Sequence, residues 1–188
     1  MYHSMLQPRK YTLLFLLFFF FSWTSYLSAA MKDDMVVEKT MTVFSQIPGL
    51  TSQQLQTSRK AFQKMHYNSQ RAVRKMSLLP GANFILSKKS WALLEQKQIS
   101  FEQLLAFEAW TDLPGATMPM ALQTLSVIRK LRREAVKTFK AALGLQGLHA
   151  DLALQMISRI NALKDANKLA AHGLFSVQGM GFKQAWAS

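Results

Sequence analysis

Apolar residues recur at helical spacing through most of the chain after residue 50. From Thr51 to about Met76 they return every three or four residues, so one side of this segment is suited to a core and the other to solvent. Segments 120–143 and 148–171 show the same period. The one β-like run, 83–86, is too short to seed a sheet. We therefore expect an all-α fold, a small bundle of about five amphipathic helices.

Two helix starts carry a strong local signal. Thr51 with Gln54, and Ser100 with Gln103, each form a capping box. In this arrangement a hydroxyl and an amide side chain satisfy N–H groups that the first turn of a helix leaves free. Helices are therefore predicted to begin just after each hydroxyl residue.

Helix ends are predicted from Pro and Gly. Shorter helices are expected at 90–97 and 100–110, followed by a loop at 111–119 that contains two prolines and a glycine. Gly144 and Gly147 permit a break after the helix at 120–143, and Gly173 is expected to end the last helix. We identify no internal repeat of fixed period.

The N-terminus has the three zones of a secretory signal peptide in their usual order. Arg9 and Lys10 precede an uninterrupted apolar run at 13–21, and small residues follow at 28–30. We interpret residues 1–30 as a signal peptide, residues 31–173 as the helical domain and residues 174–188 as an irregular tail. The protein is then expected to be periplasmic or secreted.

An uncleaved anchor is the alternative for the same segment. Residues 11–30 carry no charge, and twenty residues at about 1.5 Å each reach about 30 Å, enough to cross a bilayer. The protein would then be anchored in the inner membrane. The chain has no cysteine, so an exported domain must be held together by packing alone, which favours a bacterial envelope over eukaryotic secretion.

Positive charge is the strongest compositional feature. The chain has 23 Lys and Arg against 10 Asp and Glu, and no acidic residue lies between Glu38 and Glu95. On the predicted helices, basic residues fall opposite the apolar stripes. We take as candidate binding residues Lys60, Lys64, Arg71 and Lys75 on the first long helix, and Arg129, Lys130, Arg133, Lys137 and Lys140 on the second.

Like charges on adjacent helical turns repel one another, and most solvated helices mix signs to avoid this. A solvated surface remains the ordinary role of a charged helix face. A basic face without counter-charges of its own is, however, expected to attract an anion from outside the protein. We expect the partner to be an anionic membrane surface or an acidic envelope protein, and the chain to be a non-catalytic interaction protein, for example an accessory component of a secretion or conjugation machine. Nucleic acid is not expected as a partner of an exported protein.

The two capping boxes also carry a resemblance to a known family. The motif Leu-Thr-x-x-Gln resembles the repeated signature of the Spy and CpxP family of small helical periplasmic proteins, which act as chaperones or envelope-stress sensors. The matching residues are Leu50, Thr51 and Gln54, with Ile99, Ser100 and Gln103 as a second, less similar copy. The resemblance covers ten residues and implies a Spy-like periplasmic chaperone as the alternative function.

Catalytic chemistry is nearly absent from the sequence. There is no cysteine and no Gly-x-Ser-x-Gly, and no histidine has another ligand type at metal-binding spacing. No phosphate-binding glycine loop follows a strand. No cofactor and no metal are therefore expected. A second alternative, an envelope-acting hydrolase, would need paired carboxylates, for which Glu95, Glu102 and Glu108 are the candidates.

Overall fold

The computed structural model describes residues 35, 37–47, 49–96 and 98–187. The chain divides into two compact units, Met1–Lys39 and Thr40–Ser188, and the description below concerns the second. The predicted signal peptide at 1–30 lies outside the described residues. Within the described ranges, no helix combines the length and the apolar character that crossing a membrane requires.

The described residues are helical and contain no strand, which confirms the all-α prediction. Residues 37–45 are helical, and nine further helices follow, so the expected number of about five was too low. The helices are α2 (Ser52–Gln63), α3 (Tyr67–Ser77), α4 (Phe84–Gln96), α5 (Phe101–Thr111), α6 (Met118–Ile128), α7 (Arg133–Ala142), α8 (Ala150–Ala162), α9 (Asp165–Phe175) and α10 (Phe182–Ala187).

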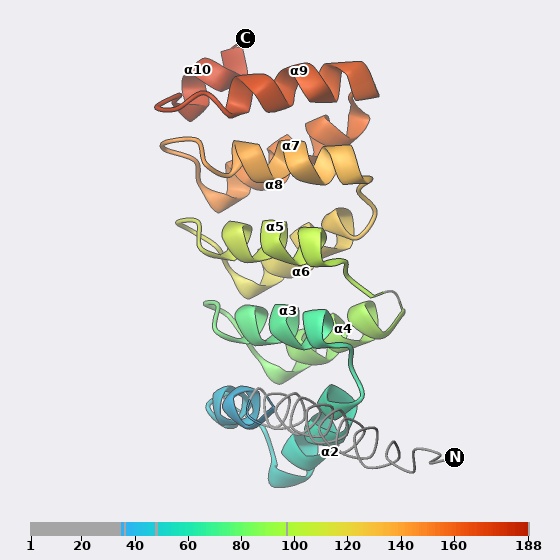
Figure 1. Ribbon diagram of the computed structural model, residues 1–188. Coiled ribbons are helices and arrows are strands. Elements are labelled where there is room, and N and C mark those ends of the chain that lie inside the picture. Colours follow the sequence, from blue (N-terminus) through green and yellow to red (C-terminus); the bar gives the residue numbers. More distant parts are fainter. Residues whose placement is uncertain (1–34, 36, 48, 97, 188) are drawn as a thin grey trace, which may run out of the picture. The chain divides into compact units, whose positions relative to one another are not determined.

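These helices are arranged as stacked hairpins (Figure 1). The hairpins α3–α4, α5–α6 and α7–α8 each pack internally, and α9–α10 follows them. Helices α3, α5, α7 and α9 contact one another in that order and form one layer. Helices α4, α6 and α8 form the second layer in the same way. Each hairpin thus buries its apolar face against its neighbours, as in α-solenoids.

A glycine with positive φ lies in the turn within each hairpin. These glycines are Gly81, Gly115, Gly147 and Gly179, and Gly49 occupies the same place before α2. In each turn the residue after the glycine donates its N–H to the carbonyl two residues before it, as Ala116 does to Leu113 at 3.3 Å. A turn of this kind requires φ above zero at its third residue, which glycine adopts without steric cost.

The spacing of these glycines reveals a repeat that the sequence analysis missed. Successive intervals between Gly49, Gly81, Gly115, Gly147 and Gly179 are 32 or 34 residues, a length used by helix-hairpin repeats. Each glycine follows an aliphatic residue and then Pro or Gln. The prediction of no internal repeat was therefore wrong. The shared signal is only three residues long, and the proline is replaced by glutamine in the last two copies.

Hydrogen bonds link each turn to the next hairpin. The carbonyl of Pro80 accepts from the N–H of Met118 at 2.9 Å, and that of Pro114 accepts from Ala150 at 3.0 Å. The carbonyl of Gln146 accepts from Phe182 at 2.9 Å. The three acceptors each directly precede a turn glycine, and the three donors are the first residues of α6, α8 and α10. Each bond satisfies one of the N–H groups that a helix start leaves free.

Large apolar side chains from both layers fill the core. Trp110, Phe107 and Phe139 are completely buried. The indole Nε1 of Trp110 donates to the carbonyl of Ala150 at 3.1 Å, so the largest core residue has its polar atom satisfied. Several methionines, among them Met76, are also buried. This is the gap-filling role that flexible thioether side chains commonly have.

Each of the three long predicted helices is in fact two helices. The segment 51–76 breaks between α2 and α3, 120–143 breaks between α6 and α7, and 148–171 breaks between α8 and α9. In each case the apolar stripe continues across the break, because both helices face the same core, so periodicity alone gave no sign of an end.

The chain end also differs from the prediction. Gly173 lies inside α9 and does not end the helix. The tail at 174–188, which was predicted to be irregular, contains the last residues of α9, a glycine turn and α10. The run at 83–86 is the entry into α4, not a strand.

Both predicted capping boxes are confirmed. Thr51 and Gln54, and Ser100 and Gln103, make the reciprocal bonds at the starts of α2 and α5. Gln103 Nε2 also donates to the carbonyls of Ile128 and Leu131, at 3.0 and 3.3 Å. This amide therefore joins the start of α5 to the connection between α6 and α7.

The role of the turn glycines is tested by two alanine substitutions. Gly115→Ala should lower the free energy of unfolding by about 1–2 kcal/mol, because at a φ of +80° the Cβ of alanine comes too close to the following carbonyl oxygen. The matched control is Gly173→Ala, within a helix, which should raise it by about 0.5–1 kcal/mol. Apart from the adjacent residues and the backbone of the same helix, no atom of the described residues lies within 4 Å of a Cβ added at either site, so neither variant introduces a clash with another element. Urea denaturation measures both. A Gly115→Ala protein as stable as the Gly173→Ala protein would contradict this role.

Candidate functional site

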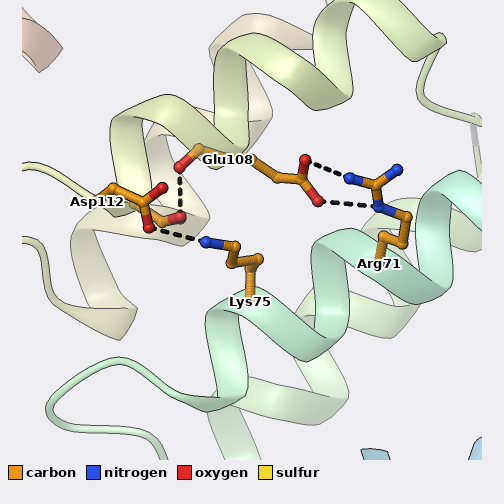
Figure 2. Close-up of polar contacts among 5 residues, drawn as sticks. Arg71, Lys75, Glu108 and Asp112 are labelled. Carbon is orange, nitrogen blue, oxygen red and sulfur yellow. Dashed lines mark hydrogen bonds and ion pairs between the residues drawn. The ribbon is translucent and has the colours of Figure 1, made fainter. Parts of the chain in front are cut away.

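Two candidate cations on α3 are paired with the carboxylates of Glu108 on α5 and of Asp112, which directly follows α5 (Figure 2). Arg71 makes a bidentate bond to Glu108, with Nε to Oε1 at 3.0 Å and Nη2 to Oε2 at 2.6 Å. Lys75 Nζ donates to Asp112 Oδ1 at 2.7 Å. The Glu108 side chain is only 14% exposed, whereas that of Asp112 is 67% exposed. The first pair is therefore better shielded from water than the second.

Two further candidates on α7 also have acidic partners. Arg133 Nε lies 3.6 Å from Glu102 Oε1 on α5, and Lys137 Nζ lies 3.2 Å from Glu134 Oε1 one turn away. The expectation of basic faces without counter-charges is therefore wrong at Arg71, Lys75, Arg133 and Lys137. At Arg71, Lys75 and Arg133 the physical reason is the stacking, because α5 lies between α3 and α7 and acidic residues of α5 and its C-cap reach both neighbours. Lys137 is paired within its own helix.

Arg129 is not on a solvated face either. It is 8% exposed, and its Nε has no hydrogen-bond partner among the described residues. Burial lowers the pKa of its guanidinium from the ordinary value. An arginine nevertheless keeps its charge at neutral pH, so this position adds a buried positive charge next to Lys130.

The remaining candidates are exposed and form no ion pair with any described residue. They are Lys60 and Lys64 at the end of α2, Lys130 after α6, and Lys140 at the end of α7. Lys64 and Lys130 belong to connections between successive hairpins, whereas Lys140 lies at the opposite end of its helix. Lys64 and Lys130 therefore place uncompensated charge in the connections, whereas Lys60 and Lys140 place it on α2 and α7.

The chain's turns separate onto two edges of the stack, with the glycine turns on one and the connections between hairpins on the other (Figure 1). The connections 64–66, 129–132 and 163–164 each contain Lys or Arg and no acidic residue. The glycine turns 78–83, 112–117, 143–149 and 176–181 contain no Lys or Arg. We call Lys64, Lys130, Arg132 and Lys164 the basic edge.

Sequence reasoning missed two residues of the basic edge. Arg132 and Lys164 are exposed and have extended backbone as the N-cap residues of α7 and α9. Neither side chain makes a capping hydrogen bond. Both positions fall inside helices that were predicted to be continuous. Their role as edge residues becomes visible only when the helix breaks are known.

A separate groove of about 520 Å³ lies between α2 and α4. Its α2 wall is rich in hydroxyl and amide groups, and its α4 wall contains Phe84 and Trp91. These two rings are in edge-to-face contact, with centroids 6.3 Å apart. The Nε1 atom of Trp91 is buried and has no hydrogen-bond partner among the described residues.

The carboxylates considered for hydrolysis do not converge. Glu102 and Glu108 face α7 and α3 respectively, each beside an arginine, and Glu95 lines the groove at α4. Their arrangement offers no acid and base that flank a common substrate position. Within the part of the chain that the structure describes, no group of three His, Cys, Asp or Glu could hold a metal ion.

Comparison with protein-family models, with curated proteins and with solved structures finds no match for this chain.

The two ion pairs between α3 and α5 should differ in their contribution to stability. Glu108→Gln should lower the free energy of unfolding by about 1–2 kcal/mol, because it weakens a shielded, bidentate, charge-assisted contact. Asp112→Asn serves as the matched control and should cost less than about 1 kcal/mol, since that pair is exposed. Urea denaturation at low and high salt measures both. Equal losses in the two variants would show that shielding of the Arg71–Glu108 pair is irrelevant.

Proposed function

We propose that the chain is an exported, non-catalytic interaction protein that docks an anionic envelope surface through its basic edge. The observation that carries the proposal is a difference in pairing: no residue of the basic edge forms an ion pair with a described residue, whereas four of the cations in the α3–α5–α7 layer do so, namely Arg71, Lys75, Arg133 and Lys137. Binding residues are thereby reassigned from the helix faces to the connections.

The geometry of the basic edge favours an extended anionic surface. Its residues come from three connections between hairpins, α2–α3, α6–α7 and α8–α9, so they are distributed along one side of the stack and not gathered at one point; the described residues 98–100 of the α4–α5 connection carry no charge. A membrane that contains anionic lipids presents phosphates over a wide area and attracts each nearby Lys or Arg by about 1 kcal/mol. Four such residues then supply about 4 kcal/mol, about a thousandfold in affinity. An acidic envelope protein is the other partner of matching charge.

A place in a secretion or conjugation machine remains part of the proposal. Stacked helix hairpins present long surfaces for partner proteins, which is a frequent role of α-solenoids. The groove between α2 and α4 offers a surface for such contacts that does not include the basic edge.

A Spy-like chaperone is the second candidate, favoured by the groove between α2 and α4. Its polar and aromatic walls suit an extended, unfolded segment, to which aromatic rings provide contact area and hydroxyl groups provide hydrogen bonds. Suppression of client aggregation that persists at high salt and is lost in Trp91→Ala, while Lys64→Gln leaves it unchanged, would favour this candidate over docking by charge.

Vesicle binding by charge-neutralised variants tests the docking proposal. Lys64→Gln/Lys130→Gln should weaken the partition of the full chain onto phosphatidylglycerol vesicles by about thirtyfold at low salt, since two residues at about 1 kcal/mol each are lost. Lys88→Gln/Lys89→Gln, the control on α4, removes the same charge from exposed positions outside the basic edge. It should change partition by less than about threefold.

Partition onto neutral phosphatidylcholine vesicles provides the reference. Subtracting it from the partition onto phosphatidylglycerol vesicles removes the contribution of apolar insertion. The difference between the two variants should vanish at about 1 M salt, where the Debye length is about 3 Å. Equal losses in both variants would mean that only net charge matters. Absence of salt-sensitive binding by the unmodified chain would refute docking altogether.

A further inference from the structure

A pocket of about 490 Å³ lies within the basic edge, where the last two hairpins meet. It is lined by residues of the connections 129–132 and 163–164 and by the first turns of α7 and α9. Its charged lining residues are Lys130, Arg132, Lys164, Lys168 and Asp165. Four cations against one carboxylate give the pocket a formal net charge of +3.

The single carboxylate does not neutralise the pocket, because it is held by one of the four cations. Lys168 is 6% exposed, and its Nζ donates to Asp165 Oδ1 at 3.0 Å. That hydrogen bond lowers the pKa of Asp165, the charge of Lys168 lowers it further, and Arg132 contributes more weakly. Lys130, Arg132 and Lys164 remain without an ion-pair partner among the described residues.

Helix geometry adds to the positive potential at the same place. Arg132 and Lys164 are the N-cap residues of α7 and α9, and neither helix start is capped by a side chain. The positive ends of two helix dipoles and their free N–H groups therefore coincide with the charged lining. Arg129, which is buried and whose Nε has no hydrogen-bond partner among the described residues, directly precedes Lys130 in the chain but does not line the pocket.

We propose that this pocket binds the phosphate group of a phosphomonoester. The inference rests on the proposed function, because it assigns a specific anion to one part of the basic edge. A dianion matches a pocket with net charge +3 better than the single charge of a carboxylate or a phosphodiester does. Guanidinium and ammonium groups are the side chains that bind phosphate most often, the first through two parallel bonds and the second as a point charge.

The size of the pocket indicates that the phosphate is attached to a larger group. A volume of about 490 Å³ falls in the range of about 300–1,000 Å³ that is usual for small-molecule sites. The side chain of Asn161 adds a neutral donor and acceptor to the lining. Such a lining suits a polar group next to the phosphate. A lipid headgroup and a soluble sugar or glycerol phosphate share this chemistry.

Calorimetric titration of the full chain with glycerol 3-phosphate tests the site. The unmodified chain should bind it, and Arg132→Gln/Lys164→Gln should weaken binding by about tenfold or more, because two charge-assisted contacts are lost. The matched control, Lys88→Gln/Lys89→Gln on α4, removes two exposed charges that do not line the pocket and should change affinity by less than about twofold. Lys130→Gln provides an independent variant, and circular dichroism verifies the fold of each.

Vesicles distinguish the two sources of the phosphate. Stronger binding to phosphatidic acid than to phosphatidylglycerol vesicles of equal surface charge would support the site and assign it to a lipid headgroup. Binding of glycerol 3-phosphate without that preference would support the site and assign it to a soluble ester.

Failure of the site and failure of the proposed function give different results. If glycerol 3-phosphate does not bind and phosphatidic acid is not preferred, while salt-sensitive binding to phosphatidylglycerol persists, the phosphate site is overturned and docking stands. If glycerol 3-phosphate binds and no vesicle does, docking is overturned and the site stands. Tight binding of a glutamate-rich peptide without phosphate binding would overturn the site in favour of an acidic protein.

Discussion

One recurring hydrogen bond sets the arrangement of the hairpins. Its donor is the first N–H of the second helix in a hairpin, and its acceptor is a carbonyl in the turn of the preceding hairpin. It recurs at Pro80, Pro114 and Gln146, directly before a glycine with positive φ each time. The conformation of the turn leaves this carbonyl free to accept from the following hairpin. The donor is the N–H at the start of that hairpin's second helix, which would otherwise be unsatisfied. All glycine turns consequently lie on one edge of the stack, and all connections between hairpins lie on the other (Figure 1).

Electrostatic properties follow from this stacking. Because α3, α5 and α7 are neighbours in one layer, acidic residues of α5 reach cations on both sides, as Figure 2 shows for Arg71 and Lys75. The layer is thus largely compensated. The connections 64–66, 129–132 and 163–164 contain no acidic residue, and their cations, on the opposite edge from the glycine turns, form no ion pair with a described residue. Docking to an anion is therefore proposed for the edge and not for the helix faces.

Local signals allowed part of this fold to be predicted. Helical periodicity and two capping boxes gave the fold class and the starts of α2 and α5. The breaks before α7 and α9 were missed because Arg132 and Lys164 provide no capping bond and the apolar stripe continues past them. The Arg71–Glu108 pair joins residues 37 positions apart, so no local pattern could reveal it. Lys64 and Lys130 were predicted as candidates because they fall on the basic faces of the predicted helices. Arg132 and Lys164 were not, because their place in a connection depends on the helix breaks that were missed.

Mapping the contact surface by NMR tests most directly the claim that the connections form the binding edge. Backbone amide shifts of the full chain would be followed during titration with small bicelles that contain phosphatidylglycerol. If the connections bind the surface, the perturbations should be concentrated at 64–66, 129–132 and 163–164, with the glycine turns 78–83, 112–117 and 143–149 unchanged. Perturbations centred on those glycine turns, or on the exposed faces of α3 and α5, would contradict this claim.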